Sequence, residues 1–131
     1  MAELLVIALG GAIGACLRFS ISLFVANAHL HTAMGAGIAN IIGSFLLGLL
    51  VGHLESGHAH PLLRPFLTVG VFGSFTTFSA LAMDNRTLAS EAGEIMALMQ
   101  LVVTVALGLA AFAAGNALEN RLEGSRGDGE E

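Results

Sequence analysis

Four apolar stretches, each about as long as a membrane-spanning helix, dominate this chain of 131 residues. They cover residues 4–25, 34–54, 62–83 and 95–118. A helix needs about 20 predominantly apolar residues to cross the hydrocarbon core of a bilayer. Only 11 % of the residues are charged, against about 25 % in soluble domains, so the chain could not cover a water-exposed surface. The pattern predicts an integral membrane protein with four transmembrane segments.

The four segments are expected to be helices, because a membrane offers the backbone no water and each spanning segment must satisfy its own N–H and C=O groups. The polar joints between them are short, which predicts an all-α, up-down-up-down bundle with both termini on one side of the membrane. Residues 1–118 form the predicted transmembrane domain. Residues 119–131 are rich in acids and glycine, and this composition predicts a disordered acidic tail.

The third stretch contains a small, polar segment that is unusual for the middle of a membrane span. Glycine, serine and threonine crowd residues 70–79. Glycine tolerates non-helical dihedral angles, and serine and threonine hydroxyls can bond to the backbone locally. We therefore predict a break in the third helix at mid-membrane, with exposed carbonyl groups that could bind a hard cation such as Na⁺. The alternative is an unbroken helix whose hydroxyls bond back to its own carbonyls.

Small and polar side chains recur at every fourth residue along the second stretch: Ala36, Asn40, Ser44, Gly48 and Gly52. Such a stripe lets two helices approach closely. Asn40 differs from the others, because an amide in mid-membrane costs free energy unless it has a partner. It either joins two helices or lines a hydrated path.

The positive charges give only a weak preference for one orientation of the chain in the membrane. There is no lysine, and the five arginines divide almost evenly. Arg64, Arg121 and Arg126 would lie on the side of the termini, and Arg18 and Arg86 on the other. Because positive residues set topology, such a chain could insert both ways and pair with an inverted copy of itself. We predict an antiparallel, dual-topology homodimer.

The composition also argues against several classes of function. The net charge of −5 makes a nucleic-acid partner unexpected, since phosphate binding needs a basic surface. The single cysteine, Cys16, allows no disulfide within the chain. The histidines offer no convincing metal-ligand set and are interpreted as loop residues: His29, His31, His53, His58 and His60. No nucleophile–base pair or phosphate-binding loop is present, so an enzyme is not expected.

Three segments carry glycine-rich and polar motifs: GGAIGACLR at 10–18, ANIIGSFLLG at 39–48 and GVFGSFTTFS at 70–79. Together they resemble the Fluc/CrcB family of bacterial fluoride channels, and the likeness covers about residues 4–118. The resemblance implies a fluoride-selective channel in the bacterial inner (plasma) membrane, which gives passive export of cytoplasmic fluoride and protects against its toxicity. It also implies an antiparallel dimer with two pores, each built from both subunits, around a central structural Na⁺.

The resemblance assigns roles to individual residues. By position, the backbone carbonyls of Gly73 and Thr76 would hold the Na⁺. Phe78 would be the pore phenylalanine, and Asn40 the pore asparagine.

A polar track on the fourth helix would comprise Gln100, Thr104 and Gly108. Three positions in this chain depart from the family pattern. Leu81 stands where a second phenylalanine is usual, Gln100 heads the track, and Gly108 offers no hydroxyl at its last position.

These residue types suit fluoride, a small and tightly hydrated anion. A pore that strips its water must supply several close hydrogen-bond donors, and the candidate O–H and N–H donors are Asn40, Ser44, Ser79, Gln100 and Thr104. The positive edge of the Phe78 ring can solvate an anion without binding it tightly, as conduction requires. Arg18 is a permanent charge that either raises the anion concentration in a pore vestibule or anchors its helix at the interface.

Two other functions are alternatives. A proton-coupled exporter, resembling the small four-helix multidrug transporters, would need a carboxylate buried in a spanning helix, and the predicted spans keep their acids near their ends. A non-transporting accessory subunit would need only helix packing, which leaves the polar third span and Asn40 unexplained. The fluoride channel is therefore preferred, with fluoride, the lipid bilayer and a second copy of the chain as partners.

Overall fold

The computed structural model describes residues 1–28, 31–55 and 60–127, and this part of the chain is helical nearly throughout. Four stretches are long and apolar enough to cross a membrane: Ala2–Asn27, Gly35–Leu54, Leu63–Ala92 and Glu94–Leu122. Helix α1 (Ala2–Asn27) is followed by a short 3₁₀ turn, η1 (Thr32–Met34), and by helix α2 (Gly35–Glu55). The fourth span belongs to α6 (Glu94–Gly127). For the described residues, the predicted all-helical fold with four spans is confirmed.

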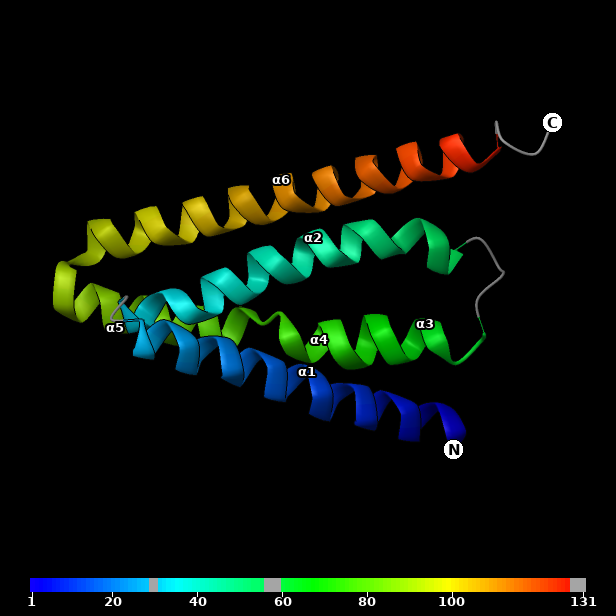
Figure 1. The fold of residues 1–131 in the computed structure, drawn as a ribbon. Helices are drawn as coiled ribbons and strands as arrows, with labels where there is room; N and C mark the ends of the chain where they lie inside the picture. Colours follow the sequence, from blue (N-terminus) through cyan, green and yellow to red (C-terminus); the bar gives the residue numbers. More distant parts are fainter. Residues whose placement is uncertain (29–30, 56–59, 128–131) are drawn as a thin grey trace.

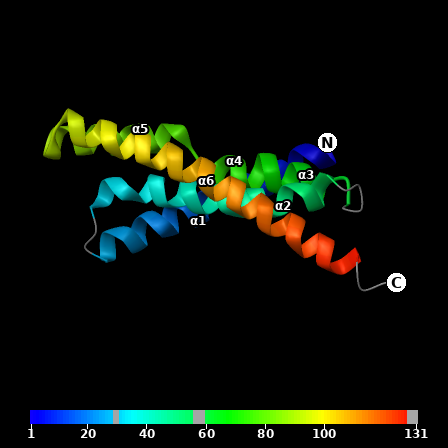
Figure 2. The same cartoon turned by 90° about the horizontal axis from the view of Figure 1, so that it is seen from above.

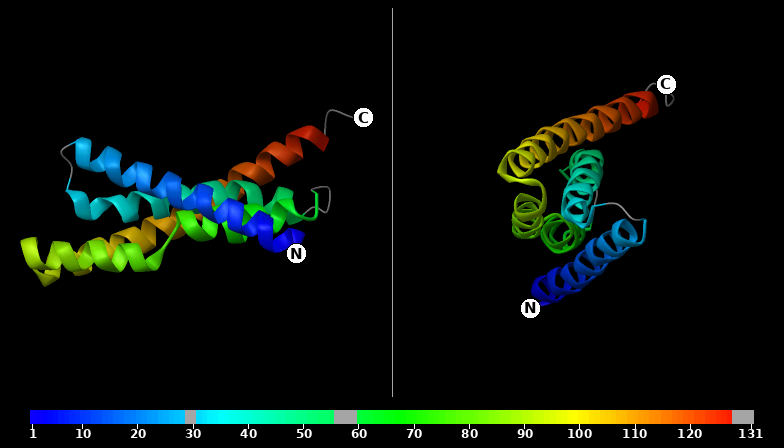
Figure 3. Two further views of the ribbon diagram at one scale, coloured as in Figure 1. Left: turned by 90° about the horizontal axis from the view of Figure 1, so that it is seen from below. Right: turned by 90° about the vertical axis from the view of Figure 1, so that its left-hand side faces the viewer.

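The spans alternate in direction, so that the start of α1 and the end of α6 lie at the same end of the molecule (Figure 1). α6 packs along α2 and also contacts α5 (Phe78–Ala92), the last helix of the third span. α1 packs against the earlier part of the third span and against α2. Seen along the spans, α1 and α6 lie on opposite sides of the other two (Figure 3), and α6 crosses α2 obliquely (Figure 2). The spans therefore form a layered bundle rather than a closed ring.

Close approach of backbones at glycine allows this layering. A Cβ on Gly14 of α1 would collide with the carbonyl oxygen of Val71 in the third span. A Cβ on Gly48 of α2 would likewise collide with the carbonyl oxygen of Phe112 in α6. Backbones this close gain dispersion contacts that larger side chains would prevent. Gly14 of α1 and the small-residue stripe of α2 thus serve helix packing.

The third span is divided into short segments. One turn of α-helix, α3 (Leu63–Pro65), leads into π-helical geometry over η2 (Phe66–Phe72) and a further turn, α4 (Gly73–Phe75). Thr76 and Thr77 then have extended dihedral angles, with φ −92° and ψ 130° at the first and φ −152° and ψ 130° at the second. Figure 1 shows the thin connection between α4 and α5. We call these two extended residues the junction.

The third span is longer than the sequence analysis predicts. A polar joint is expected from Asp84 onward, but α5 continues through it to Ala92. The Asp84 carboxylate accepts a hydrogen bond from the backbone N–H of Ala36 at 2.9 Å. This N–H belongs to the first turn of α2, where a negative charge satisfies an unpaired donor and complements the helix dipole. The acid therefore has a partner inside the bundle, and the chain turns only at Gly93, whose φ is 95°.

Helix α6 also extends past its predicted limit. The predicted tail begins at residue 119, but α6 continues to Gly127 without an end at that boundary. Glu119 is only 5 % exposed, and its Oε2 accepts a hydrogen bond from the backbone N–H of Gly52 at 3.2 Å. Packing against α2 thus holds the first residue of the predicted tail in the helix. Residues 128–131 of that tail lie outside the described residues.

Large apolar side chains cover the outer faces of the spans. Leu9 in α1, Val69 in the third span and Leu109 in α6 are each more than half exposed. In water such a surface would promote association, whereas in a bilayer it faces acyl chains. Among the buried residues are small ones such as Ala36 and Ala39, as expected where helices pack without a hydrophobic driving force between them.

Candidate functional site

Asn40 of α2 binds the backbone of the junction. Its Nδ2 donates to the carbonyl oxygen of Thr77 at 3.3 Å, and its Oδ1 accepts from the N–H of Thr77 at 2.8 Å. The side-chain amide therefore satisfies both polar backbone groups of an extended residue within the span, where an unpaired group would cost free energy. Asn40 thus joins α2 to the junction.

The same contact changes the bonding of the carbonyl groups before the junction. In a continuous helix the Thr77 N–H would donate to the Gly73 carbonyl, four residues earlier, but here it donates to Asn40. The N–H and the hydroxyl of Thr76 both donate to the Phe72 carbonyl, at 2.9 and 2.8 Å. The Gly73 carbonyl, one of the two predicted Na⁺ ligands, thus loses its helical donor. Thr76, the other, lies outside both helices.

Arg18 of α1 also reaches this region. The residue is half-buried, and its guanidinium Nε donates to the carbonyl oxygen of Ser74 in α4 at 3.2 Å. The sequence leaves two roles open for Arg18, a vestibule charge or an interfacial anchor. The contact adds a third, because it ties α1 to the last turn before the junction. A fixed positive charge therefore lies beside the segment that contains Gly73 and Thr76.

A groove of about 380 Å³ opens beside the junction. α2 contributes Asn40 and Ser44 to its lining, α5 contributes Phe78, and α6 contributes Thr104. The rest of the lining comprises Thr76, Thr77, Leu81, Val105, Gly108, Leu109 and Phe112. We call it the central groove. The structure thus brings four of the predicted pore residues to one surface from three helices.

The central groove combines close helix contact with an open aromatic ring. Thr104 is only 7 % exposed, and a Cβ on Gly108 would lie 3.6 Å from the Ser44 hydroxyl oxygen, so α2 and α6 are close here. Leu81, where the family resemblance implies a second phenylalanine, is 2 % exposed. Phe78 is 70 % exposed. Its ring is therefore available to an ion or to a second chain.

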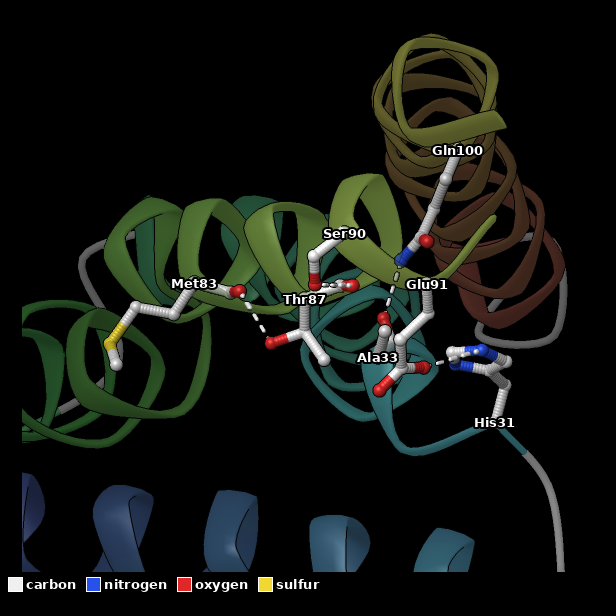
Figure 4. A network of polar contacts seen from close by, with 7 residues as sticks. All are labelled: His31, Ala33, Met83, Thr87, Ser90, Glu91 and Gln100. Carbon is white, nitrogen blue, oxygen red and sulfur yellow. Dashed lines mark hydrogen bonds and ion pairs between the residues drawn. The ribbon is translucent and has the colours of Figure 1, made fainter. Parts of the chain in front are cut away.

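Gln100 and Ser79 do not line the central groove. Gln100 donates through Nε2 to the Ala33 carbonyl in η1 (Figure 4). It lines a separate, largely apolar groove of about 550 Å³, to which Thr104 also contributes. Ser79 is exposed, and its hydroxyl oxygen lies 2.8 Å from that of Thr77. The predicted donors are therefore not all at one site. Asn40, Ser44 and Thr104 line the central groove, Gln100 lines the apolar groove, and Ser79 lies on the exposed surface beside Thr77.

Sequence reasoning missed three acidic contacts. Asp84 and Glu119 accept backbone N–H groups of α2, and the Glu91 carboxylate lies 3.2 Å from Nε2 of His31, which lines the apolar groove (Figure 4). A signal existed for Asp84, because an acid that directly follows an apolar run in a span requires a partner. No pattern in the sequence pairs Glu119 with Gly52.

A side-chain metal centre is not found in the described part of the chain, where no three His, Cys, Asp or Glu residues gather. His29 and His58 lie outside the described residues. The predicted Na⁺ ligands are backbone carbonyl groups and do not belong to such a cluster.

Known proteins resemble this chain over most of its length. The profile of a family described as "CrcB-like protein, Camphor Resistance (CrcB)" matches residues 5–116, which include the whole central groove. A fluoride-specific ion channel FluC of Aeromonas salmonicida is 39 % identical over 109 residues, covering 81 % of this chain and 86 % of the relative. Fluoride-specific ion channel FluC 2 of Nocardia farcinica is 40 % identical over 115 residues, 87 % of this chain and 82 % of the relative. A FluC of Parabacteroides distasonis is 36 % identical over 116 residues, 88 % and 91 % of the two chains.

Proposed function

Because the chain belongs to the CrcB family, we propose that it is a fluoride-selective ion channel that lets cytoplasmic fluoride leave the cell passively. Such a channel protects the cell from fluoride toxicity. The named relatives are ion channels and not enzymes. With its four apolar spans, the chain is a multi-pass protein of the bacterial membrane.

The central groove is the observation that supports a fluoride path most directly. Fluoride gives up its hydration water only where protein donors replace it. Ser44 and Thr104 can each donate an O–H, and the Asn40 amide nitrogen carries a second N–H besides the one bound to Thr77. The edge of the Phe78 ring adds a weak positive field. Several moderate sites in series let an ion bind and leave, as conduction requires.

A second, inverted copy of the chain completes the groove in this proposal. Phe78 is 70 % exposed in the single chain, so its ring can face the groove of a partner. Two antiparallel copies related by a two-fold axis would close two equivalent pores against each other. The nearly even distribution of the arginines between the two ends of the spans supports insertion in both orientations.

The carbonyl groups of Gly73 and Thr76 would hold a structural Na⁺ at the centre of this dimer. The fit is a chemical one, since the Gly73 carbonyl has lost its helical donor and the Thr76 backbone is extended. Carbonyl oxygens are suitable ligands for a hard monovalent cation. The bound ion would supply positive charge beside the two pores and hold the junctions of both copies together.

Anion efflux from liposomes that contain the purified chain tests the function. Vesicles loaded with fluoride are expected to empty rapidly, and vesicles loaded with chloride to retain their content. Equal rates for the two anions would contradict a fluoride-selective channel. A requirement for a proton gradient would favour the alternative, a proton-coupled exporter.

The same assay tests the cation. Replacing Na⁺ on both sides of the membrane, and throughout purification, with a bulky organic cation is expected to weaken fluoride efflux. Unchanged efflux would remove Gly73 and Thr76 from the proposed site.

A further inference from the structure

A second hollow adjoins the central groove at Phe78. It has a volume of about 340 Å³ and lies between α5 and α6. Phe78 lines both hollows. We call the second hollow the outer groove; its polar residues are Asn85, Arg86 and Glu94.

The outer groove follows one face of α5 away from the junction. Ala82, Asn85 and Ala89 line it at the three- and four-residue spacing of a helical face that begins at Phe78, and the two alanines leave space. At 1.5 Å per residue, Asn85 lies about 10 Å further along the helix than Phe78. Half of the hydrocarbon core measures about 15 Å. With the junction at the membrane centre, the groove therefore leads most of the way to the membrane surface.

Asn85 places a free amide in this groove. The residue is half-buried, and its Oδ1 is fully covered and has no hydrogen-bond partner in the described structure. Its Nδ2 keeps access to the surroundings and bonds to no other described residue. The free-energy cost of the covered, unpaired atom belongs to Oδ1, which is an acceptor and cannot bind an anion. The Nδ2 atom carries two N–H donors, and these are the groups that an anion in the groove would bind.

Two opposite charges flank the outer groove. Arg86 lies on α5, and Glu94 is the first residue of α6. Both side chains are exposed, and they form no ion pair with another described residue. A guanidinium raises the local concentration of anions, and a carboxylate lowers it. Each charge can therefore be removed separately, with opposite expected effects on an approaching anion.

We propose that the outer groove is one mouth of the fluoride path and that Asn85 binds fluoride there. The ion would occupy this site before or after it passes Phe78, while Arg86 concentrates fluoride at the mouth. The inference rests on the proposed channel function and adds a binding residue outside the central groove.

Efflux from liposomes that contain Asn85 variants tests the binding role. Asn85→Ala removes the N–H donors and is expected to lower the fluoride efflux rate about tenfold to a hundredfold, the range for one lost hydrogen bond to a charged group. Asn85→Asp is similar in size but replaces the donors with a negative charge, so its rate is expected to be lower still. The matched control is Asn116→Ala, at a half-buried asparagine of α6 that lines neither the central nor the outer groove. Its rate should equal that of the unsubstituted chain.

The two charges give an independent readout, because exposed side chains can be changed without disturbing the fold. Arg86→Gln is expected to lower the efflux rate at low ionic strength, and Glu94→Gln to raise it. Both effects should shrink when salt is added, since the screening length falls to about 10 Å at 0.1 M.

Unchanged rates for both Asn85 variants would overturn the binding role. Changes of the same sign for Arg86→Gln and Glu94→Gln, or changes that salt does not reduce, would overturn the assignment of the mouth. If an Asn85 variant fails to form the oligomer of the unsubstituted chain, the efflux rates of Arg86→Gln and Glu94→Gln test the proposed mouth instead. An unsubstituted chain that conducts no fluoride would instead refute the channel function itself, so the two failures are distinguishable.

Discussion

At the scale of single residues, Asn40 serves both the backbone and the central groove. Its amide binds the N–H and the C=O of Thr77, and the residue also lines the groove with a further N–H to offer. Phe78 lines the same groove but is 70 % exposed. Substitutions at the two positions should therefore separate the support of the junction from the conduction of ions.

Asn40→Ala is expected to lower both fluoride efflux and thermal stability. The change leaves both backbone groups of Thr77 without partners, at a cost of about 1–3 kcal/mol each. Phe78→Ile keeps the junction intact and should lower efflux with little loss of stability. Thermal unfolding in detergent and efflux from liposomes measure the two effects separately. Equal losses of stability in the two variants would contradict the role of Asn40 in supporting the junction.

Gly108 is a position where a hydroxyl can be added. The nearest neighbour of a Cβ there would be the Ser44 hydroxyl oxygen at 3.6 Å, an ordinary van der Waals contact. Gly108→Ser should therefore fit, place a donor in the central groove and raise the fluoride efflux rate. Gly108→Ala, the control, fills similar space without a donor. A serine variant no faster than the alanine variant would show that this hydroxyl does not act on the ion.

At the scale of the helical elements, the irregular third span depends on its neighbours. η2 and α4 pack against α1, and α2 supports the junction through Asn40. The backbones of α1 and the third span are in contact at Gly14. The position of α1 should therefore affect how well the junction is held.

Gly14→Ala is expected to lower the melting temperature and the fluoride efflux. Its Cβ would collide with the carbonyl oxygen of Val71 and lie 3.0 Å from the backbone nitrogen of Phe75, and backbone atoms cannot rotate away. Overpacking of this kind costs about 1–3 kcal/mol. Gly11→Ala is the control on the same helix. The nearest neighbour of its Cβ would be the hydroxyl oxygen of Ser74 at 3.2 Å, and the Ser74 side chain can move away by changing its rotamer. A melting temperature for Gly14→Ala equal to that of the unsubstituted chain would contradict the tight packing of α1.

The main features of these elements can be predicted from the sequence, because the thickness of a bilayer determines both the length and the apolar character of a span. The ends of the spans are harder to predict, because they depend on contacts between helices. α5 continues through Asp84, which binds the N–H of Ala36, and α6 continues through Glu119, which packs against Gly52. A sequence does not reveal such partners.

The candidate site is likewise predictable within one helix but not between helices. Asn40 and Ser44 are four residues apart on one helix, so their shared face is predictable. The α6 residue that joins them depends on the angle at which α6 crosses α2. Thr104 consequently lines the central groove, whereas Gln100, about one turn earlier, bonds to η1.

At the scale of the whole molecule, the balance of positive charge becomes important. The chain has five arginines and no lysine, and the arginines divide three to two between the two sides of the predicted spans. A small change in this balance should therefore orient every copy in the same direction.

In the proposed dual-topology dimer, a pair of added arginines is expected to force every copy of the chain into one orientation. Asn27→Arg with Ala28→Arg adds charge at the end of α1, and Ala2→Arg with Asn120→Arg adds it at the opposite end of the molecule; all four residues are exposed. Each double variant expressed alone should insert in one orientation, fail to form antiparallel dimers and lose fluoride efflux. Co-expression of the two should restore efflux. Full activity of either double variant alone would contradict an antiparallel dimer.

Helix α6 contains 34 residues and is therefore about 51 Å long, whereas the hydrocarbon core is about 30 Å thick. Its last turns must project into water. In an antiparallel pair, one such rod would stand out from each face of the membrane. An antibody against residues 120–127 would then reach half of the copies on intact spheroplasts, and the other half only after the membrane is opened.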